Sequence, residues 1–204
     1  MMKILIDNGH GVNTPGKRSV DGKLREGRLA RIIARAIVED MQRRGYDASL
    51  LTPEDDDIPL RERVARVNQW CDKLGKRNVC VVSIHHDAMG DGKKWDDANG
   101  WSCRCSIGKG ASRVSDRSQM LAQCLFEAAG QTCMRKMLRQ YPDKPYWVQN
   151  LAICRDTKCA AVLTENFFMT NLLDYQFLMT DFGQQRVIDS HVRALIKYVD
   201  LCEG

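Results

Sequence analysis

Residues 79–84 form an almost continuous apolar run, Val-Cys-Val-Val-Ser-Ile, which is followed by two adjacent histidines, His85 and His86. A strand that is apolar on both faces must be covered on both faces, as happens at the centre of a parallel sheet. Residues 79–85 therefore predict a central strand. This prediction constrains the rest of the chain, because other elements have to supply both covering layers.

Strand-like and helix-like segments alternate along most of the remaining sequence. We expect further strands at 3–7, 47–51, 100–107, 151–154 and 160–164, and helices that start at Glu26 and Leu60 and that span 113–138, 171–179 and 184–201. Residues 100–107 alternate like an edge strand. The residues expected to face inward from the helix at 113–138 are Met120, Leu121, Cys124, Leu125 and Ala128. Because 204 residues are enough for one sizeable core, we predict a single α/β domain over residues 1–204.

The chain has 31 Lys and Arg against 26 Asp and Glu, a formal net charge of +5. Both signs are interspersed, so nucleic-acid binding is weakly supported, and an acidic polymer surface is an equally good partner. Four arginines fall on the polar face expected for the first helix: Arg25, Arg28, Arg31 and Arg35. A solvated charged face is the usual explanation of such a pattern, so we expect no nucleic-acid partner.

The first residues, MMKILIDNGHG, do not resemble a signal peptide, because the apolar run at 4–6 is short and Asp7 follows it at once. No stretch approaches the ~18 apolar residues that a membrane-spanning helix needs. We therefore expect a protein made in the cytoplasm without a signal peptide and without membrane insertion. No feature of the sequence predicts an oligomeric state.

The nine cysteines are odd in number and scattered along the chain, and several lie in apolar segments. No C-x-x-C pair exists, which argues against a four-thiolate zinc site. We interpret the cysteines as reduced structural thiols, consistent with a reducing compartment.

Three potential metal ligands occur at the ends of predicted elements. His10 follows the first strand, Glu26 begins the first helix and His85 ends the central strand. Sites in α/β proteins are built at strand ends and in the loops after them. Two imidazoles and one carboxylate supply three ligands and leave one position open, the pattern of a catalytic zinc site. The alternative for each histidine is a hydrogen-bonded or exposed residue without a ligand role.

Glu165 directly follows the apolar strand at 160–164. It is either a general acid/base beside a metal-activated water or a carboxylate that caps the following turn. The adjacent histidines pose a similar choice. Successive strand residues point to opposite faces, so His85 and His86 should not both reach one metal ion, and alternation alone does not say which one does.

Several short motifs occur in a specific order along the chain. They are ILIDNGHG at 4–11, Glu26 with the helix after it, LRERVARVN at 60–68, VVSIHHDA at 81–88, the strand region from Gly100, Ser118 with Leu121-Ala122, and TENFFMTN at 164–171. Together they resemble the zinc-dependent N-acetylmuramoyl-L-alanine amidases of bacterial cell-wall hydrolases and phage endolysins. Each motif is common by itself, whereas the ordered combination covers nearly the whole chain.

The resemblance implies a twisted, mostly parallel six-stranded sheet with helices on both faces. It implies that Zn²⁺ is held by His10, Glu26 and His85, the histidine that follows Ser-Ile, and that Glu165 is the acid/base. The implied reaction is hydrolysis of the amide between N-acetylmuramic acid and the L-alanine of the peptidoglycan stem peptide. The missing signal peptide favours the phage or prophage branch, which reaches the cell wall after lysis or holin-type release.

Three residues near these motifs are candidate substrate contacts: His86, Asp87 and Asn166. The chain departs from the family pattern at Asp87, where Asn is common, and at Asn166, where Gly is common. These departures concern substrate contacts and not the metal ligands.

The loops at 86–99 and 141–150, the second with Tyr146 and Trp147, are candidate walls of a substrate groove. The alternative is that these aromatic residues pack on the body of the protein. Two other functions remain open at this stage. They are a zinc peptidase of other amide specificity and a non-catalytic peptidoglycan-binding domain.

Overall fold

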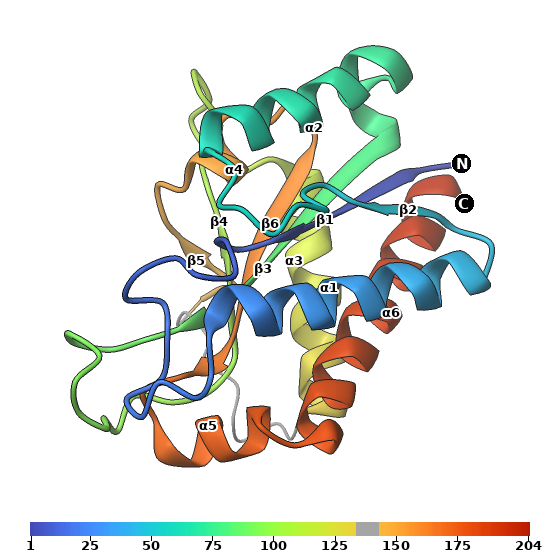
Figure 1. The fold of residues 1–204 in the computed structure, drawn as a ribbon. Coiled ribbons are helices and arrows are strands. Elements are labelled where there is room, and N and C mark those ends of the chain that lie inside the picture. The colour runs from blue at the N-terminus through green and yellow to red at the C-terminus, as the bar shows by residue number, and fades with distance from the viewer. Residues whose placement is uncertain (134–142) are drawn as a thin grey trace.

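The computed structural model describes residues 1–133 and 143–204, which form a six-stranded sheet between two layers of helices (Figure 1). The strands are β1 (Lys3–Asn8), β2 (Asp47–Leu50), β3 (Val79–Asp87), β4 (Ser102–Cys105), β5 (Trp147–Val148) and β6 (Ala160–Phe168). The helices are α1 (Glu26–Arg43), α2 (Leu60–Leu74), α3 (Asp116–Thr132), α4 (Ala152–Arg155), α5 (Leu172–Leu178) and α6 (Asp181–Glu203), with a 3-10 turn, η1, at Lys76–Asn78.

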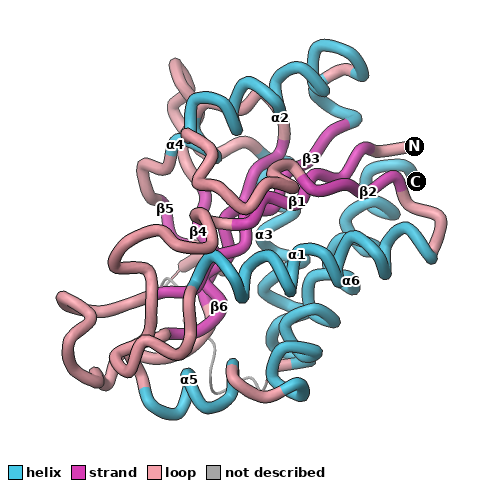
Figure 2. Tube along the Cα trace, in the orientation of Figure 1, coloured by secondary structure: helices cyan, strands magenta, loops and turns pink. Residues whose placement is uncertain are grey.

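The strand order across the sheet is β2-β1-β3-β6-β4-β5. The first four strands in this order run parallel, β4 is antiparallel to β6, and β5 is parallel to β4. Helices α1, α3 and α6 cover one face of the sheet, whereas α2 and α4 cover the other (Figure 1 and Figure 2). The predicted single-domain α/β fold, with a mostly parallel six-stranded sheet and helices on both faces, is confirmed.

β3 lies at the centre of the sheet, between β1 and β6. Its side chains alternate between two cores. Cys80, Val82 and Ile84 belong to the larger core, against α1, α3 and α6, while Val79 and Val81 belong to the smaller core, against α2 and α4. Because successive residues of a strand point to opposite faces, burial on both faces explains the apolar run at 79–84.

A buried ion pair connects α2 to the end of β1. Arg63 and Asp7 are 2% and 1% exposed, and Arg63 Nη1 lies 2.8 Å from Asp7 Oδ1. The same guanidinium donates to the carbonyl oxygens of Asn8 and Ile58, and the Ser83 hydroxyl donates to the other oxygen of Asp7. The pair thus links the ends of β1 and β3 to the helix that covers them.

The predicted strand at 151–154 is wrong. These residues begin a single helical turn, α4, in which the N–H groups of Cys154 and Arg155 donate to the carbonyl of Leu151. A short apolar run does not distinguish a strand from a buried helical turn, and Ile153 and Cys154 are buried in this turn.

The sixth strand is instead β5, inside a segment predicted as a loop. It pairs Trp147 with Arg104 and Val148 with Cys105. β4 is therefore flanked by β5 and β6, and the prediction of an edge strand at 100–107 is wrong. A strand of two residues is too short to show a hydrophobic period, which is why the sequence did not reveal it.

α3 begins later than predicted, at Asp116, because Ser115 caps its first turn by accepting a hydrogen bond from the Ser118 N–H. The end of the predicted helix, at 134–138, lies outside the described residues. Met120 does not face inward as expected, since it is 36% exposed. The other residues expected to face inward are buried: Leu121, Cys124, Leu125 and Ala128.

Arg31 does not lie on a solvated face of α1 as predicted, because it is 4% exposed. Its guanidinium donates to the carbonyl oxygens of His10 (2.7 Å), Gly27 (2.8 Å) and Glu54 (2.8 Å). A guanidinium has five N–H donors, so one side chain holds together three separate segments. Arg28 and Arg35 are exposed, and Arg25 precedes the helix.

α6 is a 23-residue helix that packs against α1 and α3. Thr180 caps its start by accepting a hydrogen bond from the Gly183 N–H. Among the described residues, no helix is both long enough and apolar enough to cross a membrane.

The nine cysteines are unpaired, and eight of them are buried. Burial raises the pKa of several of these thiols, including Cys80 and Cys103, well above the usual value. Such thiols stay protonated at neutral pH and pack as small apolar side chains.

The buried Arg63 guanidinium predicts a large effect of removing its charge. We expect Arg63→Met to lower the free energy of unfolding by about 3–5 kcal/mol, because the Asp7 carboxylate stays buried without its partner. Denaturant unfolding measures the change. The exposed neighbour Arg61→Met is the control and should change stability by less than about 0.5 kcal/mol. A loss below about 1 kcal/mol for Arg63→Met would contradict the importance of the pair.

Candidate active site

The turn after β1 places His10. This residue has a φ of 60°, in the left-handed region, which costs a non-glycine residue roughly 1–2 kcal/mol. Its neighbour Gly9 lies directly against His85, and a Cβ at Gly9 would collide with that imidazole. The turn, and the absence of a side chain at Gly9, let the imidazoles of His10 and His85 meet edge to face, with ring centroids 5.0 Å apart.

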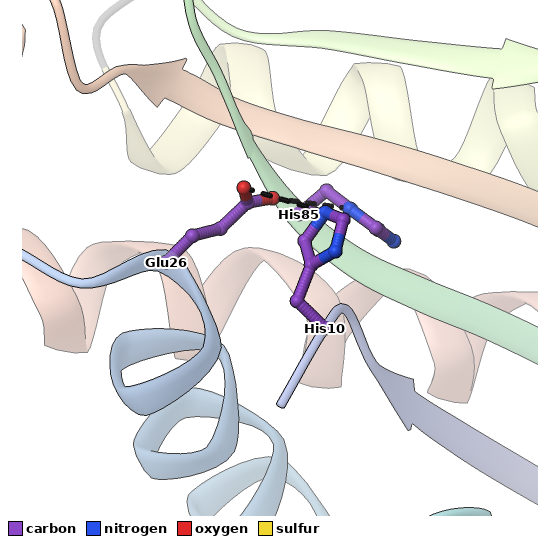
Figure 3. Close-up of side chains that lie close together, drawn as sticks. All are labelled: His10, Glu26 and His85. Atoms are coloured by element: carbon purple, nitrogen blue, oxygen red, sulfur yellow. Dashed lines mark hydrogen bonds and ion pairs between the residues drawn. The ribbon is translucent and has the colours of Figure 1, made fainter. Parts of the chain in front are cut away.

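Glu26 is the first residue of α1, and it is 2% exposed. The next residue, Gly27, lets the helix approach the turn, because a Cβ at Gly27 would collide with the carbonyl oxygen of Gly11. The first turn of α1 therefore lies against the backbone after β1. The Glu26 carboxylate points towards the imidazoles of His10 and His85, as Figure 3 shows.

The three side chains form one compact cluster (Figure 3). Glu26 Oε1 lies 3.1 Å from His85 Nδ1 and accepts a hydrogen bond from the His86 N–H at 3.2 Å, and Glu26 Oε2 lies 3.4 Å from His10 Nε2. One potential ligand atom from each of the three residues lies within 4.8 Å of the others. Residues from β1, α1 and β3 thus converge on a single point.

Burial and charge set the protonation of this cluster. Burial lowers the pKa of His10 to about 4, so its imidazole is neutral at pH 7. Burial alone would raise the pKa of Glu26, but the contact with His85 and the charges of the histidines lower it to about 2. Burial likewise opposes protonation of His85, yet the contact with Glu26 raises its pKa above the ordinary value. The result is an ionised carboxylate between two imidazoles.

Glu165 lies on β6 beside the cluster. β3 and β6 are paired in parallel with His85 opposite Glu165, so the two side chains project from the same face of the sheet. Burial raises the pKa of Glu165 to about 7. Within the described residues, its Oε2 atom is buried without a hydrogen-bond partner. A carboxylate in this state gains and loses a proton near neutral pH, as a general acid/base must.

Arg104 of β4 forms an ion pair with Glu165. Its Nε lies 3.7 Å from Glu165 Oε1, its Nη2 donates to Asp87, and its Nη1 donates to Gln149 at 2.6 Å. The guanidinium and the Glu165 carboxylate are 18% and 14% exposed, so their interaction is partly shielded from water. The sequence signal for this residue is a lone charge between Cys103 and Cys105 in a strand.

Two cavities adjoin at His85. One has a volume of about 410 Å³, and its apolar lining includes Ile58, Pro59 and Leu151. The other has a volume of about 340 Å³. Its charged lining residues are Lys17, Arg18, Glu26, Asp87, Asp91 and Glu165. An apolar lobe and a charged lobe therefore flank the cluster.

A model of the N-acetylmuramoyl-L-alanine amidase family matches residues 4–197. The chain belongs to this family. The comparison confirms the family that the sequence motifs resemble, and with it the expected amidase function. A search of curated proteins found no match.

Solved structures support the fold of this amidase. CwlV, an N-acetylmuramoyl-L-alanine amidase from Bacillus (Paenibacillus) polymyxa var. colistinus, superposes over 98% of this chain and 99% of its own catalytic domain, with a TM-score of 0.79 at 19% identity. The amidase from Clostridium difficile 630 gives a TM-score of 0.78 at 22% identity, over 98% and 97% of the two chains. The catalytic domain of the CD27L endolysin, which targets Clostridia difficile, gives 0.70 at 17% identity, over 97% and 98%.

The amidase places its candidate substrate contacts differently from the expectation. His86 is not at a loop entrance but inside β3, where it is 2% exposed and its Nδ1 lies 2.7 Å from the carbonyl oxygen of Asn166. Asn166 is fully buried and accepts a hydrogen bond from Trp101 Nε1. These two side chains therefore face the larger core, but His86 also lines the charged lobe, together with Asp87, whereas Asn166 does not.

The loops proposed as groove walls divide in the same way. Residues 86–88 and 90–92 of the first loop line the charged lobe. In the second loop, Tyr146 is 4% exposed and belongs to the larger core, so the alternative of packing on the body holds for it. Trp147 is half-buried in β5. Residues 141 and 142 of that loop lie outside the described residues.

The space at Gly9 predicts that a single methyl group disturbs His85. We expect Gly9→Ala to displace the imidazole and to lower the free energy of unfolding by about 1–3 kcal/mol, as overpacking does. NMR signals of the His85 ring and denaturant unfolding measure the two effects. Gly108→Ala is the control, because the nearest atom to a Cβ there is 3.9 Å away. Unchanged His85 signals in Gly9→Ala would show that the contact is not tight.

Proposed function

We propose that residues 1–204 are the catalytic domain of a zinc-dependent peptidoglycan hydrolase. It cleaves the amide between N-acetylmuramic acid and the L-alanine of the stem peptide. The observation that carries the proposal is the convergence of His10, Glu26 and His85 beside Glu165, with substrate-sized cavities on both sides. We further propose that the protein acts on the cell wall after lysis or holin-type release.

The three side chains fit zinc in chemistry and in spacing. Two imidazoles and a carboxylate are common zinc ligands, and ligand atoms about 2.0–2.1 Å from a tetrahedral zinc lie about 3.3 Å from one another. Glu26 contacts His85 through Oε1 at 3.1 Å and His10 through Oε2 at 3.4 Å, and one potential ligand atom from each of the three residues lies within 4.8 Å of the others, so a small adjustment of the side chains reaches this spacing. Glu26 is ionised and His10 is neutral, as ligands must be, whereas zinc would have to displace the proton that Glu26 favours on His85. Three protein ligands leave one position for water or substrate.

Zinc held by His10, Glu26 and His85 would supply Lewis acidity at this point, for a water molecule and for the amide carbonyl. Glu165 takes a proton from the attacking water on its carboxylate and then delivers it to the nitrogen of the leaving L-alanine. A pKa of about 7 suits both steps, because the carboxylate must accept the proton and release it in one turnover. Arg104 holds the carboxylate in place from the side of β4.

The two lobes suit the two sides of the scissile amide. We propose that the substrate lies across His85. Its amide carbonyl then reaches the cluster of His10, Glu26 and His85, and the parts of the substrate on either side of the amide occupy the apolar lobe and the charged lobe. Asp87 in the charged lobe is the retained candidate for a substrate contact. This arrangement allows several substrate groups to be bound at once, which orients the amide for attack.

Muropeptide analysis of digested cell wall tests the proposal against its rivals. Cleavage of the proposed bond produces new L-alanine amino termini and no new reducing sugar ends. A zinc peptidase would produce other amino termini, and a non-catalytic binding domain would produce none. Either of these results would overturn the proposed reaction.

The cluster predicts different effects of removing the two adjacent histidines. We expect His85→Ala to lose zinc and activity, because it removes one of three ligands, and His86→Ala to keep zinc with a smaller loss of activity. Metal analysis and turnover of both variants decide between them. A chelator should abolish wild-type activity, and added zinc should restore it. Zinc loss in His86→Ala alone would reverse our assignment.

The buried carboxylate of Glu165 predicts a loss of turnover without a loss of metal. We expect Glu165→Gln to keep stoichiometric zinc and to lower kcat by a factor on the order of 10² to 10⁴, the range for a lost general base. Near-normal rates would rule out this role. Loss of zinc would instead make Glu165 a ligand.

The contacts of Arg104 predict a role in holding Glu165. We expect Arg104→Gln to lower kcat by about tenfold, or roughly 1.4 kcal/mol, with little change in KM and zinc content, because the partly shielded ion pair that orients Glu165 is lost. Arg104→Lys keeps the charge but not the forked geometry, so its kcat should lie between those of wild type and Arg104→Gln. Gln149→Ala, which removes only the third partner of Arg104, is the control. Equal kcat in Arg104→Gln and wild type would contradict the role.

A further inference from the structure

A second pair of cavities lies at the opposite end of the sheet from His85 and the two lobes that adjoin it. It opens where β3 and β6 begin, six residues of strand, or about 20 Å, from His85. The larger cavity has a volume of about 480 Å³ and is bounded by η1, the loop after β4, the first turn of α3 and the start of β6. A neighbouring cavity shares Lys109 and Lys158 with it. We call this region the basic surface.

Cations dominate the basic surface. The cationic residues that line the larger cavity are Lys76, Arg77, Lys109, Arg117 and Lys158. The carboxylates of the two cavities are already occupied, because Asp116 pairs with Arg113 at 3.0 Å and Asp156 pairs with Arg155 at 2.6 Å. Lys158 pairs with Asp72.

The other four cations of the larger cavity are not neutralised. Within residues 1–133 and 143–204, no carboxylate forms an ion pair with Lys76, Arg77, Lys109 or Arg117. Arg117 is fixed in position, since its Nη1 donates to the carbonyl oxygen of Arg77. The positive end of the α3 dipole, at Ser115, opens onto the same cavity. An anion placed here meets several positive groups at once.

The form of the surface selects the kind of anion. Lysine, arginine and a helix N-terminus together are a common combination for phosphate. The cations extend over two adjoining cavities, so they can contact successive phosphate groups of a chain. Among the residues that the structure describes, no aromatic side chain lines either cavity, so these residues offer no platform on which nucleic-acid bases could stack. We propose that the basic surface binds a linear phosphate polymer, independently of the amidase reaction.

The position of the surface gives such binding a consequence. Because the basic surface lies at the other end of the strands from His85, a polymer bound there leaves the two lobes at His85 free. The protein can then be held on a phosphate-bearing polymer while the cleft binds a separate substrate chain. The overall charge of +5 favours the first encounter with any such polymer.

The test measures binding of the full chain to three probes: long-chain polyphosphate, inorganic phosphate and phosphatidylglycerol vesicles. The test variant is Arg77→Gln with Lys109→Gln, and the control is Arg61→Gln with Arg193→Gln. Arg61 and Arg193 are also exposed and, among the described residues, without an ion pair, but they lie outside both cavities. Both double variants lower the net charge from +5 to +3, since each removes two cations.

We expect wild type and control to bind polyphosphate alike, more tightly than inorganic phosphate, and the test variant to bind about tenfold more weakly. The slope of log affinity against log salt should fall by roughly one per cation removed. Thermal unfolding and turnover of a small soluble muropeptide check that both variants fold.

Equal weakening in both variants would overturn the proposal, because net charge alone would then explain binding. Binding to vesicles but not to polyphosphate would also overturn it, in favour of a membrane surface. Neither outcome depends on whether the chain cleaves peptidoglycan.

Discussion

β3 is buried on both faces, and this burial fixes the register of everything at its carboxyl end. A shift of one residue would exchange the side chains between the larger and the smaller core. The same alternation sends His85 to the face covered by α2 and α4 and His86 to the other face. β6 follows the register of β3, so Glu165 shares the face of His85 while Asn166 joins His86 in the interior. Packing of the two cores thus determines that His85 and Glu165 lie on the same face of the sheet.

The sequence predicted the parts of the fold that depend on long hydrophobic periods. The central strand, α1 and the layered sheet were all predictable, because many residues contribute to each signal. The strand at 151–154 and the missing β5 show the limit, since segments of two to four residues carry no period. The choice of His85 over His86 as candidate ligand came from the family motif, and in the structure the burial of Val79 and Val81 in the smaller core places His85 on that same face.

The candidate ligands could be named from the sequence, but not the residues that support them. His10, Glu26 and His85 were named because their residue types occur at element ends, and the structure brings the three side chains together. Arg31 was placed on a solvated face, since a charge at helical spacing usually indicates one. In the structure it binds backbone carbonyls from three segments, and only the path of the loops after β1 and β2 reveals that need. Buried hydrogen bonding to the backbone leaves no signature in sequence spacing.

The backbone of Gly27 lies directly against the backbone of Gly11. This contact makes the position of Glu26 independent of the side chains that the loop at 12–25 exposes. The depth at which Glu26 enters the cluster is set by backbone against backbone, and not by side chains of the loop, several of which are exposed. The backbone of the loop still matters, because the Glu26 N–H donates to the carbonyl oxygen of Lys17 at 3.0 Å. Substitutions of exposed side chains, including Lys17 and Arg18 in the lining of the charged lobe, can therefore change the outer surface of the loop while Gly11 and Gly27 keep Glu26 beside the two histidines.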